Sequence, residues 1–193
     1  MYRVNEIFYS LQGEGKNTGR AAIFVRFAGC NLRCPFCDTS FDEYREMTAE
    51  GILHTIQEYP SHFMILTGGE PTLQVDESFV DYFHAAGYEV AMESNGTLAP
   101  PRNLDWLTLS PKGHLVVDRC NELKLVFEGD DDEQLRRIEA YREQVSADYY
   151  CLQPCDTGDE TYNRQLTTQC VDYILRHPQW HLSLQTHKLA HFK

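Results

Sequence analysis

The chain has 193 residues, 42% of them hydrophobic, and its excess of Asp and Glu over Lys and Arg gives a formal net charge of −12. This length suits a single domain over residues 1–193, and the acidic balance argues against a nucleic acid partner, so we expect a small-molecule substrate. No apolar run reaches the ~18 residues of a membrane span and no signal-peptide pattern begins the chain, so we expect no membrane partner and a cytoplasmic location.

Strand patterns and helix patterns alternate along the chain. Buried strands are predicted at seven apolar runs: 23–27, 63–67, 88–92, 106–109, 123–127, 149–153 and 181–185. Helical spacings of apolar residues occur in four of the gaps, one of them beginning after Thr48 as its cap, whereas residues 95–105 and 111–121 are too irregular for full helices. This alternation predicts an α/β fold with a mostly parallel sheet.

The length of the chain limits how far such a sheet extends. Eight βα units need roughly 250 residues, so we expect an incomplete (βα) barrel of about six or seven mostly parallel strands. The active site of such a fold lies at the carboxyl ends of the strands, where the loops gather.

Three of the seven cysteines, Cys30, Cys34 and Cys37, follow the first predicted strand directly. An iron–sulfur or zinc site made of protein ligands alone uses four, so three thiolates leave one iron of a cluster open to an outside ligand. The alternative is a zinc site completed by a distant His or by Cys155. No role is assigned to Cys120, Cys151, Cys155 or Cys170.

The Cys-x3-Cys-x2-Cys spacing, with Phe36 before the last cysteine, resembles the radical S-adenosylmethionine (SAM) superfamily. The resemblance implies a [4Fe–4S] cluster whose open iron takes the amino and carboxylate groups of SAM. Thr-Gly-Gly-Glu-Pro at 67–71 resembles the superfamily loop for the SAM amino group, with Glu70 as an acceptor. The residues that the resemblance assigns to SAM are Phe36, Asp38, Gly69, Glu70, Glu93, Ser110, Pro111, Lys112, Leu152, Gln153 and Pro154.

Arg26 stands within an apolar strand pattern and therefore needs a partner of opposite charge. An anionic ligand is one candidate, and a salt bridge to a core carboxylate is the other. Upstream, Leu-Gln-Gly-Glu-Gly at 11–15 offers polar side chains between two glycines, but it lacks the Lys of a phosphate-binding loop.

Together these segments resemble the 7-carboxy-7-deazaguanine synthase family of queuosine biosynthesis, and the likeness runs from residue 5 to the end. Further matching segments are Glu-Ser-Asn-Gly-Thr at 93–97, Ser-Pro-Lys at 110–112, Leu-Gln-Pro at 152–154 and Leu-Gln-Thr-His-Lys at 184–188. The resemblance implies a carbon–nitrogen lyase. A 5′-deoxyadenosyl radical takes hydrogen from C6 of 6-carboxy-5,6,7,8-tetrahydropterin, and rearrangement with loss of ammonia gives 7-carboxy-7-deazaguanine.

The same resemblance implies substrate contacts, a metal and partners. The substrate residues are Leu11, Gln12, Gly13, Glu14, Arg26, Thr67 and His187. Thr39 is expected to bind Mg²⁺ through its hydroxyl oxygen. An electron donor such as a flavodoxin or ferredoxin, and a homodimer, are also implied.

Two other functions compete with this interpretation. One is a radical SAM activating enzyme that acts on a protein partner, and the other is a non-enzymatic metal-binding module. The segments around Gln12 and His187 favour the small-molecule enzyme. A further hypothesis is that the tail beyond His187, including the terminal carboxylate, folds over the substrate.

Overall fold

The structure, a computed structural model, describes residues 1–34 and 43–193. The predicted roles of Phe36, Cys37, Asp38 and Thr39 therefore lie outside the described residues. The strands are β1 (Tyr2–Leu11), β2 (Ala21–Phe27), β3 (Arg45–Met47), β4 (Phe63–Gly68), β5 (Glu89–Ser94), β6 (Trp106–Leu109), β7 (Arg119–Phe127), β8 (Ser146–Pro154) and β9 (His181–Leu182). The helices are α1 (Ala49–Ile56), η1 (Pro71–Leu73, a 3₁₀ turn), α2 (Glu77–Ala85), α3 (Asp132–Gln144), α4 (Glu160–Arg176) and α5 (Thr186–Ala190).

The described strands form one sheet in the order β3-β1-β2-β4-β5-β6-β7-β8-β9. The run from β2 to β9 is parallel, and β1 pairs antiparallel with both β2 and β3. The predicted incomplete barrel is confirmed, with a parallel strand at each of the seven predicted runs, and the sheet stays open between its edges β3 and β9. The strands β1 and β3 were not predicted, and β9 is shorter than the predicted run over 181–185.

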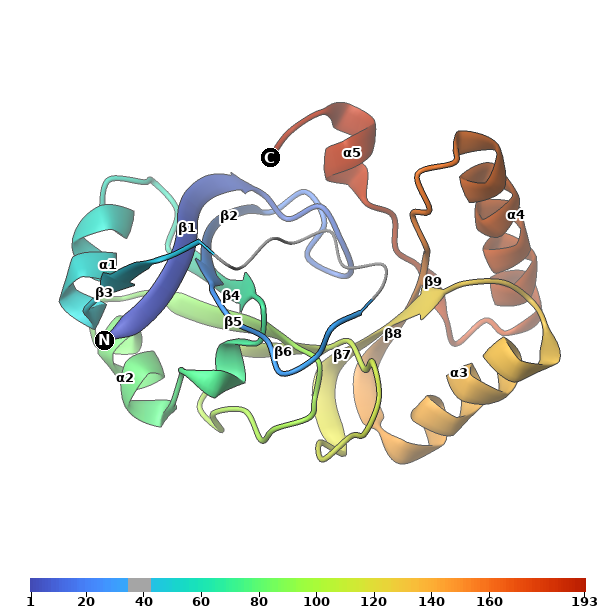
Figure 1. Ribbon diagram of the computed structural model, residues 1–193, viewed down its shortest axis with the longest axis horizontal. Helices are drawn as coiled ribbons and strands as arrows, with labels where there is room; N and C mark the ends of the chain where they lie inside the picture. Colours follow the sequence, from blue (N-terminus) through green and yellow to red (C-terminus); the bar gives the residue numbers. More distant parts are fainter. Residues whose placement is uncertain (35–42) are drawn as a thin grey trace.

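The helices begin where the sequence supplies capping side chains. Thr48 accepts a hydrogen bond from the backbone of Gly51 at the start of α1, and aspartates cap the three longer helices. The irregular segments after β5 and β6 contain no helix, as expected. Figure 1 shows α1 and α2 outside one half of the curved sheet, α3 and α4 outside the other half, and α5 apart from them on the open side.

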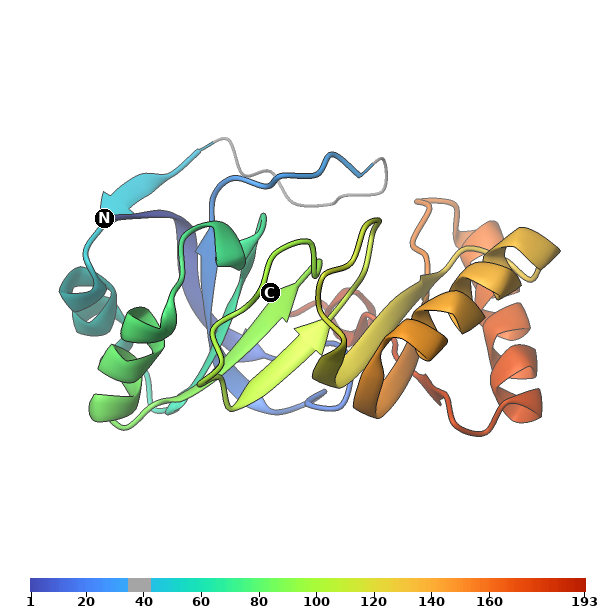
Figure 2. The same cartoon turned by 90° about the horizontal axis from the view of Figure 1, so that it is seen from below.

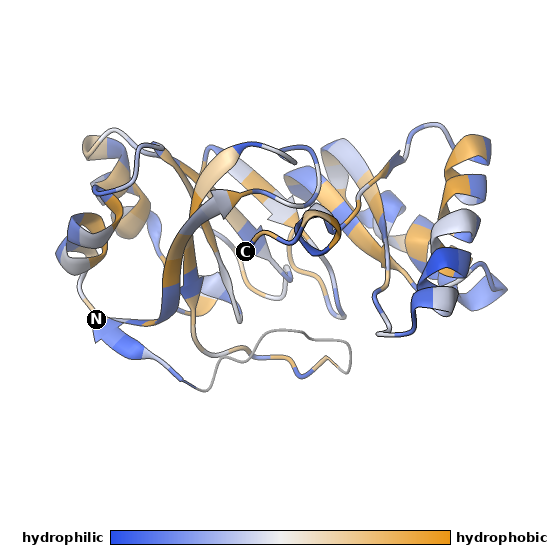
Figure 3. Cartoon of the chain, turned by 90° about the horizontal axis from the view of Figure 1, so that it is seen from above, coloured by the Kyte–Doolittle hydropathy of each residue, from blue (hydrophilic) through white to orange (hydrophobic). Residues whose placement is uncertain are grey.

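Strand alternation gives the sheet two different faces. The large core lies on the helix side and includes Val25, Leu66 and Leu123 from the strands and Phe79 from α2. A smaller apolar cluster, which includes Phe24 and Ile65, covers the amino-terminal part of the inner face. Figure 3 shows apolar residues on the strands and on the helices that cover them, while β3 is largely hydrophilic. Neighbouring residues of a strand face opposite sides of the sheet. Further along the strands, the inner face carries polar residues such as Arg26 and Thr67.

The carboxyl ends of the parallel strands meet at one edge of the sheet, where Figure 2 shows their loops gathered beside the segment that follows β2. This edge is where the sequence predicts the active site. Within the described parts of the chain, no helix has the length and apolar character needed to cross a membrane.

Candidate active site

A cavity of about 420 Å³ opens at the carboxyl ends of the strands. It is lined by all seven of the residues predicted to bind the substrate: Leu11, Gln12, Gly13, Glu14, Arg26, Thr67 and His187. It is also lined by Cys30, Cys34 and six of the residues predicted to bind SAM: Gly69, Glu93, Ser110, Lys112, Gln153 and Pro154. Residues far apart in the sequence therefore converge here, while their individual roles stay predictions.

The loop after β2 brings two cysteines of the motif to the cavity. Cys30 and Cys34 are both half-buried, and the Sγ of Cys30 accepts hydrogen bonds from the backbone N–H of Leu32 at 3.4 Å and from Nδ2 of Asn95 at 3.9 Å. Donors directed at a sulfur stabilise a thiolate, which is the form that binds iron. The described part of this loop fits an iron–sulfur cluster, and Cys37 lies outside the described residues.

The glycine pair after β4 lets the backbone approach the cysteine loop closely. Gly68 has a φ of 124°, in the region that favours glycine. A Cβ on Gly69 would lie 1.9 Å from the carbonyl oxygen of Gly29. The two segments are joined by a hydrogen bond from the N–H of Glu70 to that same oxygen. Glycine is required here because no side chain fits between the segments.

Glu70 occupies a different environment from the one the sequence suggests. Its carboxylate is fully buried and accepts hydrogen bonds from the N–H and hydroxyl of Thr72, the hydroxyl of Ser94 and the N–H of Asn95. These four donors all belong to the protein, so the carboxylate connects the loops after β4 and β5. The neighbouring Gly69, in contrast, lines the cavity itself.

Arg26 lies on the inner face of β2, between Glu6 on β1 and Thr67 on β4. Its Nε is 2.9 Å from Oε1 of Glu6, both side chains remain partly exposed, and Arg26 lines the cavity. Lys193, at the end of the tail, forms an ion pair with the other oxygen of Glu6. The ion pair that the sequence allows as an alternative to a ligand is therefore present, although the guanidinium also lines the cavity.

A buried polar network forms the floor of the cavity. Nζ of Lys124 is 2.5 Å from Oε2 of Glu14 and 3.6 Å from Oε2 of Glu93. Nε2 of Gln12 donates to Oε1 of Glu93, and Nε2 of Gln185 donates to Oε1 of Glu14, both at 2.9 Å. Burial alone would raise the pKa of Glu14, but the Lys124 ammonium and these hydrogen bonds hold it well below its usual value.

A family model described as the radical SAM superfamily matches residues 24–145. The 7-carboxy-7-deazaguanine synthase of Bacteroides thetaiotaomicron is 47% identical over 191 residues, covering 98% of this chain and 97% of the relative. The chain belongs to the 7-carboxy-7-deazaguanine synthase family. The family member of Bordetella pertussis is 44% identical over 97% of each chain. The crystal structure of QueE from Escherichia coli superposes with a TM-score of 0.80 at 27% identity, covering 95% of this chain and 93% of that one.

Membership of this radical SAM family confirms the predicted enzyme class and implies a [4Fe–4S] cluster and SAM as cofactors. It also favours the small-molecule enzyme over an activating enzyme or a metal-binding module. Within the family fold, the described residues that are predicted to bind SAM do not all line the main cavity. Pro111 lines a second cavity rather than the first, and Leu152 is fully buried beneath the site.

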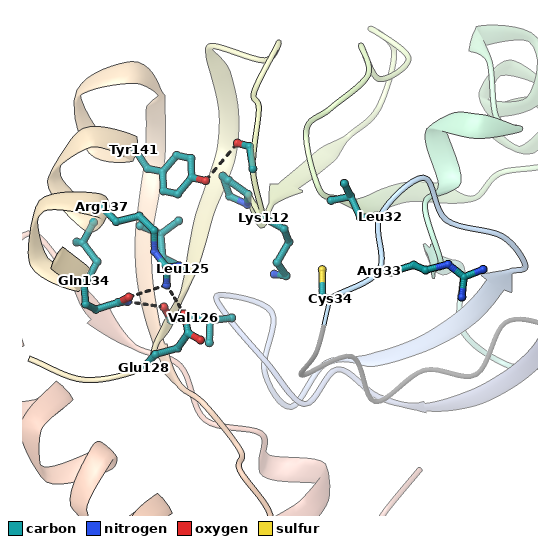
Figure 4. Close-up of a pocket in the computed structure, with 13 residues that line it drawn as sticks. Leu32, Arg33, Cys34, Lys112, Leu125, Val126, Glu128, Gln134, Arg137 and Tyr141 are labelled. Atoms are coloured by element: carbon teal, nitrogen blue, oxygen red, sulfur yellow. Dashed lines mark hydrogen bonds and ion pairs between the residues drawn. The ribbon is translucent and has the colours of Figure 1, made fainter. Parts of the chain in front are cut away.

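The second cavity, about 360 Å³, adjoins the first between the cysteine loop and α3. Figure 4 shows Lys112 and Cys34 extending into it from opposite walls, while Arg33 points away. Nζ of Lys112 donates to the hydroxyl of Ser110 at 2.7 Å, and burial, with repulsion from Lys124, lowers the pKa of Lys112. The Ser-Pro-Lys segment at 110–112 thus lines both cavities of this synthase-family site.

The sequence assigns no role to several residues that line the main cavity, among them Lys124, Asn95 and Gln185. A signal for Lys124 was present, because residues 122–125 alternate polar and apolar as a strand with one polar face does. The predicted apolar run begins at Leu123 and leaves out Glu122, so only part of this alternation falls within it.

The helix α5 closes one side of the site. Both the N–H and the hydroxyl of Thr186 donate to the carbonyl oxygen of Gly13, at 3.0 and 2.9 Å. A Cβ on Gly13 would lie 2.4 Å from Nδ1 of His187, so glycine is needed for this contact. His187 and Lys193 both line the cavity, which agrees with the hypothesis that the tail lies over the substrate.

Proposed function

We propose that the chain converts 6-carboxy-5,6,7,8-tetrahydropterin into 7-carboxy-7-deazaguanine with loss of ammonia. The observation that carries the proposal is that Cys30 and Cys34 line the same cavity as all seven predicted substrate residues. A hydrogen-abstracting reagent generated beside the cysteines would therefore be next to its substrate. The names of the full-length relatives support the same reaction.

Cys30, Cys34 and Cys37 would hold the [4Fe–4S] cluster. SAM would bind along Gly69, Ser110, Pro111, Lys112, Gln153 and Pro154, with Phe36 and Asp38 on the cysteine loop. Together, the reduced cluster and SAM supply a 5′-deoxyadenosyl radical that takes hydrogen from the substrate. Glu70, held by four protein donors, would serve SAM by fixing the backbone of Gly69.

The pterin would lie between Arg26 and the carboxylates on the cavity floor. Arg26 would hold the carboxylate of the substrate, because a guanidinium forms paired hydrogen bonds with that group. Glu14 would accept hydrogen bonds from the amino-pyrimidine edge. Since Glu93 is bonded to Gln12 and lies beside Lys124, we extend this role to Glu93, which the family resemblance had assigned to SAM.

Arg26→Gln is expected to raise the KM for the pterin about 10- to 100-fold, because a charge-assisted hydrogen bond of about 1.5–3 kcal/mol is lost. SAM affinity should stay within about twofold of the parent. Steady-state kinetics with each substrate varied in turn measures both values. Equal losses for SAM and the pterin would contradict a role specific to the substrate carboxylate.

We further propose that Thr39 binds Mg²⁺ together with the substrate carboxylate, both of which offer the oxygen ligands this ion prefers. Thr39→Ala is expected to weaken the stimulation of turnover by Mg²⁺ while the cluster content stays unchanged. Titration of Mg²⁺ with parallel iron analysis measures both. Unaltered Mg²⁺ dependence in the variant would rule Thr39 out as a ligand.

The remaining parts of the proposal concern partners and location. An electron carrier such as a flavodoxin or ferredoxin would reduce the cluster, the chain would work as a homodimer, and its location would be the cytoplasm. Sedimentation of the purified protein tests the dimer, and anaerobic reduction of the cluster by each carrier tests the donor.

Anaerobic incubation of the reconstituted protein with dithionite, SAM, Mg²⁺ and the tetrahydropterin tests the function directly. Mass analysis is expected to find 7-carboxy-7-deazaguanine. Formation of 5′-deoxyadenosine with no deazaguanine would keep the radical SAM class and reject this substrate.

A further inference from the structure

Lys124 carries a buried charge at the floor of the cavity. Its side chain is only 7% exposed, and it lies on the inner face of β7, opposite Cys151 on β8. Two carboxylates, those of Glu14 and Glu93, approach its ammonium at 2.5 and 3.6 Å. Burying charged groups together costs free energy of folding. A cluster of this kind on the floor of a cavity therefore suggests a role in binding a ligand.

The two carboxylates are held in fixed orientations from both sides. The Lys124 ammonium forms an ion pair with one oxygen of each carboxylate. Gln185 donates a hydrogen bond to the other oxygen of Glu14, and Gln12 donates to the other oxygen of Glu93. An ionised carboxylate has about four lone-pair sites, so each group keeps acceptor capacity toward the cavity that both line. The pair therefore presents acceptors, and no donor, to a ligand.

The balance of charge around Lys124 depends on groups from every neighbouring element. These titratable groups are Glu14, Glu93, Glu122, Lys112, Cys151 and His187. Burial would lower the pKa of Lys124, but the three glutamates raise it far above its usual value, so the ammonium stays charged. Burial raises the pKa of Glu122, whereas the Lys124 ammonium holds the pKa of Glu14 below its usual value.

We propose that Lys124 is a positioning residue that holds Glu14 and Glu93 together as paired acceptors, and thereby selects a substrate edge that only donates hydrogen bonds. The 2-amino and N3–H groups of a pterin form such an edge. This inference rests on the proposed function, since it specifies how that same site chooses its substrate. A 2-oxo analogue, which turns a carbonyl oxygen toward the carboxylates, is rejected because acceptor would face acceptor.

Lys124→Met removes the ammonium and leaves two carboxylates side by side, so one of them binds a proton near neutral pH. A protonated carboxyl accepts poorly but donates, and two changes follow. The Kd for the pterin rises as the pH falls. The rise is up to about tenfold per pH unit, which is the limit when binding is linked to one proton. Discrimination against the 2-oxo analogue shrinks, because the new donor can bond to its carbonyl.

The measurement is anaerobic calorimetry of the reconstituted protein with SAM and no reductant, from about pH 6 to pH 9, so that no turnover occurs. The ligands are 6-carboxytetrahydropterin and its 2-oxo analogue. In the parent, the Kd for the pterin is expected to change less than about twofold over this range, with at least about 100-fold preference over the analogue. Lys124→Arg keeps the charge and should keep the flat profile.

Lys188→Met is the matched control. Lys188 also lines the cavity but pairs with Asp156, 2.6 Å away, rather than with Glu14 or Glu93, so its loss should leave the pH profile flat. If Lys124→Met does not fold, Lys124→Met/Glu14→Gln removes one ion pair as a unit and keeps the net charge of the parent cluster. Its pterin Kd should then vary little with pH, because no pair of carboxylates remains to share a proton.

The possible results distinguish a wrong role for Lys124 from a wrong proposed function. A parent protein that does not bind the pterin rejects the proposed function, and the inference falls with it. A parent that binds the pterin, with a flat pH profile and undiminished discrimination in Lys124→Met, rejects the inference alone. A double variant whose Kd for the pterin still rises steeply as the pH falls also overturns it, because the proton would then not come from the Glu14–Glu93 pair.

Discussion

Replacing Cys34 by serine is expected to abolish cluster assembly and all cleavage of SAM. Cys34 is half-buried and lines both cavities, so its thiolate is directed at the space where the cluster is proposed to bind. A serine hydroxyl is a poor ligand for iron compared with a thiolate, and a site with three protein ligands has none to spare. The absorbance band near about 400 nm of the anaerobically reconstituted protein should be lost.

Cys155→Ser is the matched control for this experiment. Cys155 is also half-buried and lines the main cavity, but it lies outside the Cys-x3-Cys-x2-Cys motif. This variant should keep the absorbance band and the iron content of the parent. Loss of the band in Cys155→Ser together with retention in Cys34→Ser would identify a different set of ligands and contradict the cluster assignment.

Gly69→Ala is expected to lower turnover by at least about 100-fold while most of the fold survives. The added Cβ would lie 1.9 Å from the carbonyl oxygen of Gly29, which is backbone, so the cysteine loop or the loop after β4 must move. A displacement of about 1 Å in an active site costs on the order of 100-fold in rate. Turnover, SAM affinity and thermal unfolding of the variant measure the effect.

Gly113→Ala provides the comparison at a neighbouring loop. A Cβ at Gly113 meets no atom within 4 Å, so the same chemical change should leave the loops in place and the thermal unfolding unaltered. Equal activity of Gly69→Ala and the parent would show that the two loops need not approach each other as closely as the structure has them.

The fold was predictable where the period of apolar residues was regular. The parallel strands, buried on one or both faces, give continuous apolar runs such as 63–67, and capping residues such as Thr48 mark the helix starts. The strand β1 was not predicted because its register shifts between Val4 and Glu6. The shift interrupts the alternation of buried and exposed side chains along the strand. The strand β3 has three residues and no buried side chain, so it leaves no apolar pattern.

The site was predictable where its residues fall in short motifs at the carboxyl ends of strands, as Arg26, Thr67 and Gly69 do. It was not predictable where function depends on contacts between distant residues. Lys124 and Glu14 are 110 positions apart, and only the fold brings them together. The environment of Glu70 was likewise hidden, since two of its donors come from Ser94 and Asn95 at the end of another strand.

This chain is proposed to direct a SAM-derived radical to a carboxytetrahydropterin. Incubation with substrate that carries deuterium at C6 tests it most directly, with mass analysis of the nucleoside and the product. We expect deuterium at the 5′ carbon of the recovered SAM or 5′-deoxyadenosine, and 7-carboxy-7-deazaguanine in the same sample. Deazaguanine without label in either nucleoside, or labelled substrate returned unchanged beside 5′-deoxyadenosine, would contradict it.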